Sequence, residues 1–383
     1  METNRLEQAR MRASGNGRLI DLIDTNFHAN GFYFPQDILT EAAAAYFPSR
    51  HYDPDPRGAP SARNAIAAYY QRVGIPAAPD EILITASSSE SYNLIFNNLC
   101  EPGDNIILPT PGYPLFEYLA SFNHVEPRFY RLDPRENFRL DASTVEAAVD
   151  ARTRLCVLIS PNNPTGMSAG RTEIEALLEV CRKHRLTLVC DEVFSAFIYE
   201  NRPLARPATL ADDVLVLTLN GISKMYACPD LKLSWILVRG PASQAETVGG
   251  ELEIANDMYL NCSSLTQAML PSLFERGDTF QRDMVQAIDR NRQLLISALD
   301  PVEELTLHRP TSGIHAIFQL HGTRWDDDED FAVDLVEKHA CYLHPGYLYG
   351  IDVGVYGVVS FLKERSALSE GLERLVAMVR SGR

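Results

Sequence analysis

The feature of this sequence that most restricts its fold is a series of short, nearly continuous apolar runs between residues 81 and 238. Strands covered on both faces have this pattern, whereas half-exposed strands alternate apolar and polar residues. Helical segments at 89–100 and 171–184 separate several of the runs. This alternation predicts an α/β domain with a mainly parallel sheet flanked by helices. The predicted strands are EILIT (81–85), NIILPT (105–110), RLCVLIS (154–160), LTLVCDE (186–192), VLVLTL (214–219) and LSWILV (233–238).

The chain is long enough for a second domain, because 383 residues exceed the size at which a single core usually stops growing. After about residue 245 the sequence changes to long helical segments that are followed by a mixture of apolar runs and helices. We therefore predict a large domain at 46–265 and a smaller α+β domain at 266–383. Residues 1–45 are predicted to form an N-terminal arm and part of the small domain.

The composition excludes several classes of partner. A formal net charge of −16 and a pI of about 5.0 argue against nucleic acid or an anionic membrane, since both bind basic surfaces. The polar residues 1–17 lack the apolar core of a signal peptide, and no apolar run approaches the length of a membrane span. Seven unclustered cysteines are typical of reduced thiols. We therefore expect a cytoplasmic protein. The acidic run at 326–330 is interpreted as a solvated helix start, so no metal site is predicted.

Lysine is rare in this chain, yet two lysines lie close together in the segment NGISKMYACPDLKLSWILV (220–238). The chain has only five lysines against thirty arginines. A buried lysine amine can lose its proton and attack a carbonyl group, which the permanently charged guanidinium of arginine cannot do. Lys224 lies in the predicted loop that follows the strand VLVLTL (214–219). It is therefore a candidate nucleophile at the carboxyl edge of the sheet.

Three other polar groups follow predicted strands and should lie at the same edge. Asn163 lies in NNPTG (162–166), and Asp191 ends its strand, where it is either a solvated loop residue or the partner of a cationic heterocycle. The third group begins a helix, where unpaired N–H groups and hydroxyls could receive a phosphate, although a simple serine N-cap has the same sequence. Its members are Ser87, Ser88 and Ser89. Together these groups suit a phosphorylated aldehyde with a pyridine ring.

In the order SSS … NNPTG … DEVF … SK(x7)K, the chain resembles the aminotransferases of class I and II, which use pyridoxal 5′-phosphate (PLP) and share the aspartate aminotransferase fold. The resemblance extends over essentially the whole chain. It implies that Lys224 binds PLP covalently and later moves the substrate's proton, and that Asp191 pairs with the pyridinium nitrogen. It also implies that Asn163 hydrogen-bonds the phenolic oxygen and that Tyr113 stacks on the ring. The implied phosphate ligands are Ser87, Ser88, Ser89, Ser223, Lys232 and, from the second subunit of a homodimer, Tyr52.

Four positions depart from the family pattern. Lys232 replaces an arginine that would hold the phosphate, and Gly221 replaces a residue with a phosphate-binding hydroxyl. Phe194 replaces a tyrosine that donates to the phenolic oxygen of the cofactor. Val358, in GVVSFL, stands where an arginine would bind the α-carboxylate of the substrate, and there is no arginine between Arg324 and Arg365.

The missing arginine leaves two interpretations of substrate binding. Either another group holds the carboxylate, or the carboxylate is not held in the usual way and the reaction is not simple transamination. The candidate groups are Arg57, His28, His315 and His344. Gly31 and Tyr33, in ANGFYFP, resemble the loop that closes over the substrate in this family.

The sequence therefore supports three functions. The first is an aminotransferase that acts on an amino acid. The second is a PLP-dependent lyase or decarboxylating deaminase in secondary metabolism, for example one that performs β-elimination on a cysteine conjugate. The third is a catalytically silent binding module of the same fold. Retention of Lys224, Asp191 and Asn163 together argues against the silent module, which needs none of them.

Overall fold

The computed structural model describes residues 4–382, except for 16, 18, 201–202 and 261. The largest sheet within these residues contains the seven strands β2 (Ile82–Thr85), β3 (Asn105–Thr110), β4 (Glu126–Arg131), β5 (Thr153–Ile159), β6 (Thr187–Asp191), β7 (Val216–Gly221) and β8 (Ser234–Arg239). Their order in space is β2–β8–β7–β6–β5–β3–β4. All neighbours from β7 to β4 are parallel, whereas β8 is antiparallel to both β2 and β7. The predicted mainly parallel sheet is confirmed, with one reversed strand.

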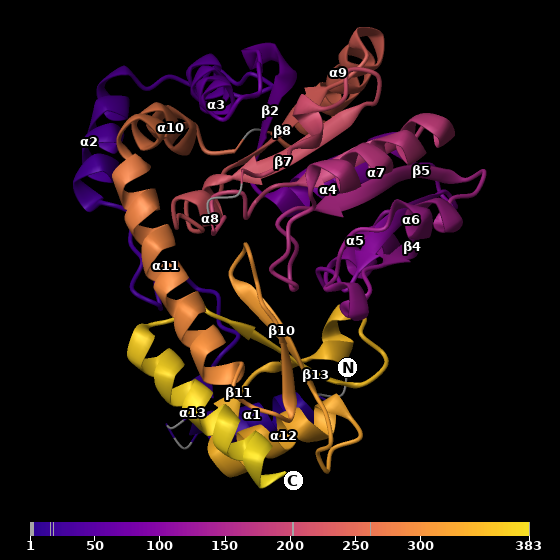
Figure 1. Ribbon diagram of the computed structural model, residues 1–383. Coiled ribbons are helices and arrows are strands. Elements are labelled where there is room, and N and C mark those ends of the chain that lie inside the picture. The colour runs from indigo at the N-terminus through magenta and orange to yellow at the C-terminus, as the bar shows by residue number, and fades with distance from the viewer. Residues whose placement is uncertain (1–3, 16, 18, 201–202, 261, 383) are drawn as a thin grey trace.

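Helices cover both faces of this sheet, which explains why its strands are nearly continuous in apolar residues (Figure 1). On one face, Leu83 and Ile236 belong to an apolar layer shared with α4 (Ser88–Leu99), α5 (Phe116–Phe122) and α9 (Ala242–Tyr259). On the other face, Ile84 and Leu237 belong to the larger core, which includes residues of α3 (Pro60–Arg72), α6 (Ala142–Ala148) and α7 (Arg171–His184). The helices α2 (Gln36–Tyr46) and α10 (Ser264–Arg276) pack beside α3.

A second, smaller sheet is formed by residues from the C-terminal part of the chain. Its strands are β9 (Leu305–His308), β10 (His315–Leu320), β12 (His344–Pro345) and β13 (Val355–Ser360), all antiparallel in the order β12–β13–β10–β9. Around it lie α1 (Arg5–Gly15), α12 (Asp328–His339) and α13 (Arg365–Ser381), together with the short parallel pair β1 (Ile20–Asp21) and β11 (Cys341–Tyr342). The domain boundaries near residues 45 and 265 stay a prediction.

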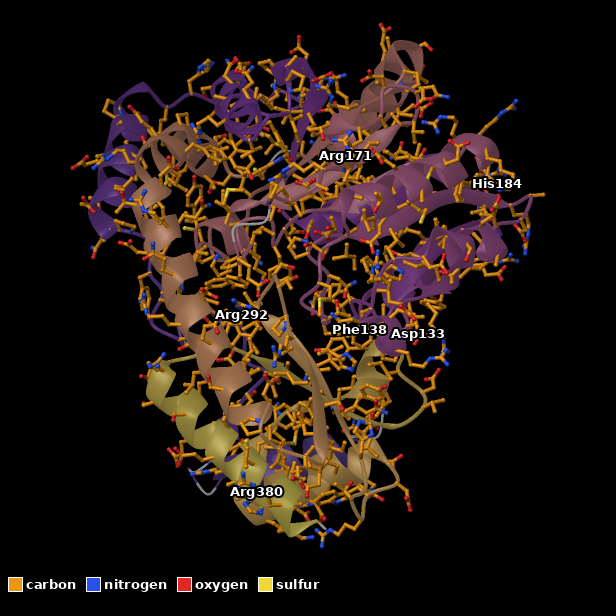
Figure 2. The ribbon with its side chains drawn as sticks, in the orientation of Figure 1. Asp133, Phe138, Arg171, His184, Arg292 and Arg380 are labelled. Carbon is orange, nitrogen blue, oxygen red and sulfur yellow. The ribbon has the colours of Figure 1, made fainter. Side chains whose placement is uncertain are left out.

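The long helix α11 (Asp278–Leu299) runs along one side of the molecule from α10 to α13 (Figure 1). Its Arg292 is almost fully buried, and the guanidinium donates to the carbonyl oxygen of Pro310 at 2.8 Å (Figure 2). The same guanidinium lies 4.7 Å from the ring centroid of Tyr199. Arg292 therefore connects α11 to the loop between β9 and β10 and to the segment that follows β6.

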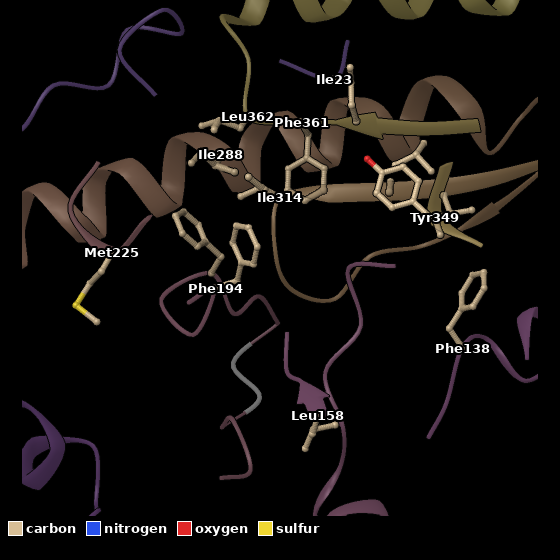
Figure 3. Close-up of a cluster of buried hydrophobic side chains, with 14 of the residues drawn as sticks. Ile23, Phe138, Leu158, Phe194, Met225, Ile288, Ile314, Tyr349, Phe361 and Leu362 are labelled. Carbon is tan, nitrogen blue, oxygen red and sulfur yellow. The ribbon is translucent and has the colours of Figure 1, made fainter. Parts of the chain in front are cut away.

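An apolar cluster joins the loops of the large sheet to the second sheet. Figure 3 shows Phe194, which follows β6, and Met225 of the short helix α8 (Ile222–Met225) near Ile288 of α11, Ile314 and Phe361. Most of these side chains are almost completely buried. The cluster fixes the loops after β6 and β7 against the second sheet. No helix among the described residues has the length and apolar character required to cross a membrane.

Candidate active site

Polar side chains from several loops of the large sheet meet in one cavity of about 340 Å³. The loops that follow β2, β3, β5, β6 and β7 contribute, in that order, Ser88 with Ser89, Tyr113, Asn163, Asp191 and Lys224. The cavity thus lies beyond the carboxyl ends of the strands, where open α/β sheets bind their ligands. Its volume is within the usual range for a small-molecule site. The second sheet and the turn after β12 contribute His315, His344 and Tyr349.

Asp191 is a buried carboxylate at the end of β6 that faces this cavity. The N–H of Val193 donates to its Oδ1 at 3.0 Å, and the hydroxyl of Tyr92 donates to its Oδ2 at 2.9 Å. Burial raises the pKa of Asp191, and the two hydrogen bonds oppose that rise. A cation bound in the cavity would favour the ionised carboxylate.

Among the described residues, Lys224 is the one lysine that lines the cavity. Its amine forms no ion pair with any other described residue. Its Nζ lies 5.6 Å from the ring centroid of Phe27 and 5.9 Å from that of Phe194. Burial lowers the pKa of Lys224, and the nearby positive charge of Lys232 lowers it further. The amine is therefore easier to deprotonate than an exposed lysine, as a nucleophile requires.

Asn163 and two serines supply hydrogen-bonding groups to the cavity wall. The buried Oδ1 of Asn163 has no hydrogen-bond partner among the described residues, and an unpaired buried amide costs free energy unless a ligand satisfies it. Ser87 is the N-cap of α4 and accepts from the N–H of Glu90 at 3.1 Å. Ser88 and Ser89, in the first turn of this 12-residue helix, line the cavity instead. The serine run thus includes both the N-cap and two hydroxyls available to an anion.

Several predicted site residues do not line this cavity. Arg57 binds Glu253 at 2.6 Å and the carbonyl oxygen of Asp80 at 2.6 Å. His28 contacts the carbonyl oxygen of Ala227 at 3.0 Å and stacks on Tyr33. The predicted residues outside the cavity lining are Ser87, Ser223, Lys232, Tyr52, Gly31, Tyr33, Arg57 and His28.

The four departures from the family pattern have distinct surroundings. Phe194 lies over the Lys224 amine, and Lys232 is exposed but close enough to lower its pKa. Val358 is completely buried in β13, directly across from His344 of β12. Gly221, the last residue of β7, pairs with Ser234 at the start of β8.

Sequence reasoning missed three polar residues of the cavity. These are Tyr92, Thr25 and Tyr349. Tyr92 has a recognisable signal, because residues four apart on a helix share a face and Tyr92 follows Ser88 by four positions. Thr25 and Tyr349 come from an N-terminal loop and a short turn, and no local pattern points to them.

Fold and cavity together define an α/β protein that presents a readily deprotonated lysine in a ligand-binding crevice. The family described as "Aminotransferase class I and II" matches residues 24–365. The chain belongs to this family, whose members depend on PLP, and the family predicted from the sequence motifs is confirmed.

Individual relatives include enzymes of more than one reaction type. The chain is 26% identical to nicotianamine aminotransferase 1 of Oryza sativa over 326 residues, which are 83% of this chain and 66% of that one. It is 29% identical over 323 residues to the S-alkyl-thiohydroximate lyase SUR1 of Arabidopsis thaliana, with 82% and 69% coverage. The chain thus spans just under two thirds of the rice enzyme. Among solved structures, an alanine aminotransferase from Pyrococcus furiosus superposes with a TM-score of 0.92 at 22% identity, covering 100% of both chains. This similarity confirms the fold.

Proposed function

We propose that this chain binds PLP and is an aminotransferase that acts on an α-amino acid. One observation carries the proposal: the Lys224 amine, whose pKa is lowered by burial, shares a cavity with the Asp191 carboxylate and with Asn163, whose Nδ2 can donate a hydrogen bond. These groups fit the aldehyde, the ring nitrogen and the phenolic oxygen of PLP, respectively.

Each part of PLP has a partner among the cavity residues. Lys224 would hold its aldehyde carbon, Asp191 its ring nitrogen and Asn163 its phenolic oxygen. The hydroxyls and N–H groups of Ser88 and Ser89 would receive the phosphate. Tyr113 lies on the cavity wall, edge-on to Phe116, and would contact the ring. Bound PLP supplies an electron-withdrawing ring that weakens the bonds at the substrate's Cα.

The remaining chemistry belongs to Lys224 and Asp191. Lys224 is the lysine among the cavity residues that would take a proton from the substrate's Cα and return one. Asp191, buried and doubly hydrogen-bonded, would hold the ring nitrogen in its protonated form. Phe27 and Phe194 beside the Lys224 amine exclude water from it.

Mass spectrometry after borohydride reduction tests this proposal. We expect the purified protein to be yellow and to carry a reduced pyridoxyl group on Lys224. Lys224→Ala should abolish both the colour and the adduct. Lys338→Ala is the control, because Lys338 of α12 lies outside the cavity, and it should retain the adduct. A colourless protein with no adduct, or an adduct elsewhere, would reject the proposal and favour a silent binding module.

A lyase is the second candidate, because no arginine is found among the described residues that line the cavity. Without a guanidinium to fix the α-carboxylate, the bond that is held perpendicular to the ring is less strictly determined. The 29% identity to a plant lyase supports the same candidate. This second candidate also includes a decarboxylating deaminase, which would remove the carboxylate of the substrate.

Reaction products separate the two candidates. Transamination leaves the cofactor in its amine form and needs a keto acid for each further turnover. Elimination from a cysteine conjugate releases thiol and ammonia without any added keto acid. Continuous release of thiol and ammonia would make lyase activity the function, whereas strict dependence on a keto acid would establish transamination.

We also propose that the protein is a homodimer. Its support is a group of exposed apolar side chains at the end of α9, where Ile254, Met258 and Tyr259 are 70%, 71% and 60% exposed. Tyr52, the residue predicted to reach a second subunit, is 75% exposed. Light scattering should give about twice the chain mass of 42.8 kDa. A mass of one chain at micromolar concentration would contradict the dimer.

A further inference from the structure

The wall of the cavity contributed by the second sheet contains two histidines, one on each of the strands that flank β13. His315 begins β10 and pairs with Ser360 of β13, while His344 of β12 pairs with Val358 of the same strand. Side chains two residues apart on a strand share a face, and so do directly opposed residues of an antiparallel pair. His315, Val358 and His344 therefore lie on one face of the sheet, and both imidazoles line the cavity.

His315 is a buried polar side chain without a protein partner. Only 5% of it is exposed, and its ring nitrogens form no hydrogen bond with the described residues. Its ring lies edge-on to Phe194 at 6.2 Å between centroids. A buried imidazole normally finds a hydrogen-bond partner. A ligand in the cavity is the group that can supply one.

His344 is oriented by a neighbouring phenol. Its Nδ1 lies 3.0 Å from the hydroxyl of Tyr349, which also lines the cavity. With the Tyr349 hydroxyl as donor, the proton of the neutral ring lies on Nε2. His344 then has one N–H free for a ligand, and Tyr349 is its positioning residue.

Few donors remain for the substrate once PLP has its partners. Lys224, Asp191, Asn163, the serines and Tyr113 are then engaged, and Tyr92 donates to Asp191. The remaining polar groups of the lining are Thr25, His315, His344 and Tyr349. The substrate carboxylate is an anion, and of these groups only the two imidazoles can become cations.

We propose that His315 and His344 form the site that binds the α-carboxylate of the amino-acid substrate, on either side of the buried Val358. This inference rests on the proposed function, because it assigns the substrate end of the same cavity. It specifies a carboxylate held by two imidazole N–H donors rather than by a bidentate guanidinium.

Binding of the carboxylate should take up a proton. In the absence of ligand, burial lowers the pKa of His315 to about 3, with Lys224 and His344 as further causes. Burial likewise lowers the pKa of His344 to about 4, where Arg10 of α1 lowers it further and Glu7 of α1 opposes the shift. Both rings are therefore neutral near pH 7. A bound carboxylate raises both pKa values, so its affinity should increase as the pH falls.

Propionate and propionamide are suitable probes, since they differ in charge and have no amine that could react with PLP. Titration of the PLP-loaded protein, followed through the absorbance of bound PLP, gives the dissociation constant of each. We expect propionate to bind at least tenfold more tightly than propionamide. His315→Leu and His344→Leu should each weaken propionate binding at least fivefold and leave propionamide unchanged.

Two further variants separate this site from general effects on folding. His315→Gln keeps an N–H donor but cannot titrate, so it should retain part of the propionate affinity and reduce the pH dependence to the part that His344 contributes. His308→Gln is the matched control, because His308 is equally buried on β9 but does not line the cavity. It should bind propionate as the unmodified protein does.

The outcomes distinguish the inference from the function on which it rests. Unchanged propionate affinity in both leucine variants, with the Lys224 adduct intact, would overturn the histidine site and leave the proposed function standing. Equal affinity for propionate and propionamide would overturn it as well. Absence of the Lys224 adduct from the unmodified protein would reject both proposals.

Discussion

At the scale of single residues, the environment of Asp191 depends on Tyr92, which lies one helical turn after Ser88 in α4. The Tyr92 hydroxyl is one of only two donors to this carboxylate among the described residues, and both ends of the hydrogen bond are buried. Because the hydrogen bond lowers the pKa of Asp191, its loss would favour the protonated carboxyl group. A neutral carboxyl group attracts a ring cation less strongly.

We predict that Tyr92→Phe weakens PLP binding by about threefold to tenfold, which corresponds to the usual contribution of one buried hydrogen bond. Titration of the PLP-free protein, followed by absorbance, would measure the dissociation constant. Tyr130→Phe is the control, because Tyr130 is equally buried but donates to the carbonyl oxygen of Val157, away from the cavity. Equal effects of the two substitutions would mean that Tyr92 acts only on the stability of the fold.

At the scale of elements, the pairing of β7 with β8 gives Gly221 a structural explanation. A Cβ atom added at Gly221 would lie 2.4 Å from the Oγ of Ser234, its partner across the two strands. Glycine at 221 therefore leaves space for the Ser234 side chain. In the family pattern a residue with a hydroxyl occupies the position of Gly221.

We predict that Gly221→Ser destabilises the protein by about 1–3 kcal/mol, because overpacking of a buried site has this cost. The double variant Gly221→Ser, Ser234→Gly should recover part of the loss, since it removes the clashing Oγ but leaves the carbonyl oxygen of Leu233 at 2.9 Å from the added Cβ. Urea unfolding of both variants and of Ser234→Gly alone would complete the double-mutant cycle. Additive effects of the two substitutions would contradict a direct steric pairing.

The sequence predicted those elements whose physical signal is local. The six apolar runs coincide with β2, β3, β5, β6, β7 and β8, because strands between two layers of helices need apolar residues on both faces. The edge strand β4 (Glu126–Arg131) was not predicted, since most of it is exposed or half-buried and its sequence is polar. The reversal of β8 was not predicted either, because strand direction depends on contacts across the sheet.

The cavity residues likewise divide into those with a local sequence signal and those whose position depends on contacts between distant strands. Ser88, Ser89, Asn163, Asp191 and Lys224 follow strands, and parallel strands bring such residues to one edge. His315 and His344 were only two of four candidates for the carboxylate, because their proximity to Val358 depends on the register of an antiparallel sheet. That register is not visible along the chain.

At the scale of the whole molecule, buried histidines connect stability to pH. Burial lowers the pKa of His308 to about 4, while in the unfolded chain a histidine titrates near 6.5. Below that pH the unfolded state binds a proton that the folded state does not. The stability contributed by neutral His308 is therefore present above about pH 6.5 and is lost as the pH falls toward 4.

We predict that, between pH 6.5 and pH 4, the unmodified protein loses about 1.4 kcal/mol more stability per pH unit than His308→Gln. Comparison of the two proteins removes the contributions of other groups, among them Asp328, whose raised pKa acts in the opposite direction. Urea midpoints at several pH values would give the two slopes. Parallel slopes would show that His308 is protonated in the folded protein.

The cavity wall comes from two separate sheets and the segments after their strands, with Lys224 in α8 after β7 of the large sheet and the histidines on the second sheet. Mutations at positions 315, 344 and 358 can therefore change which molecules are accepted without altering the attachment of the chromophore. A library restricted to these three positions would keep its yellow colour as an internal marker of correct assembly. Loss of that colour on exposure to a candidate compound would then identify new substrates directly, colony by colony.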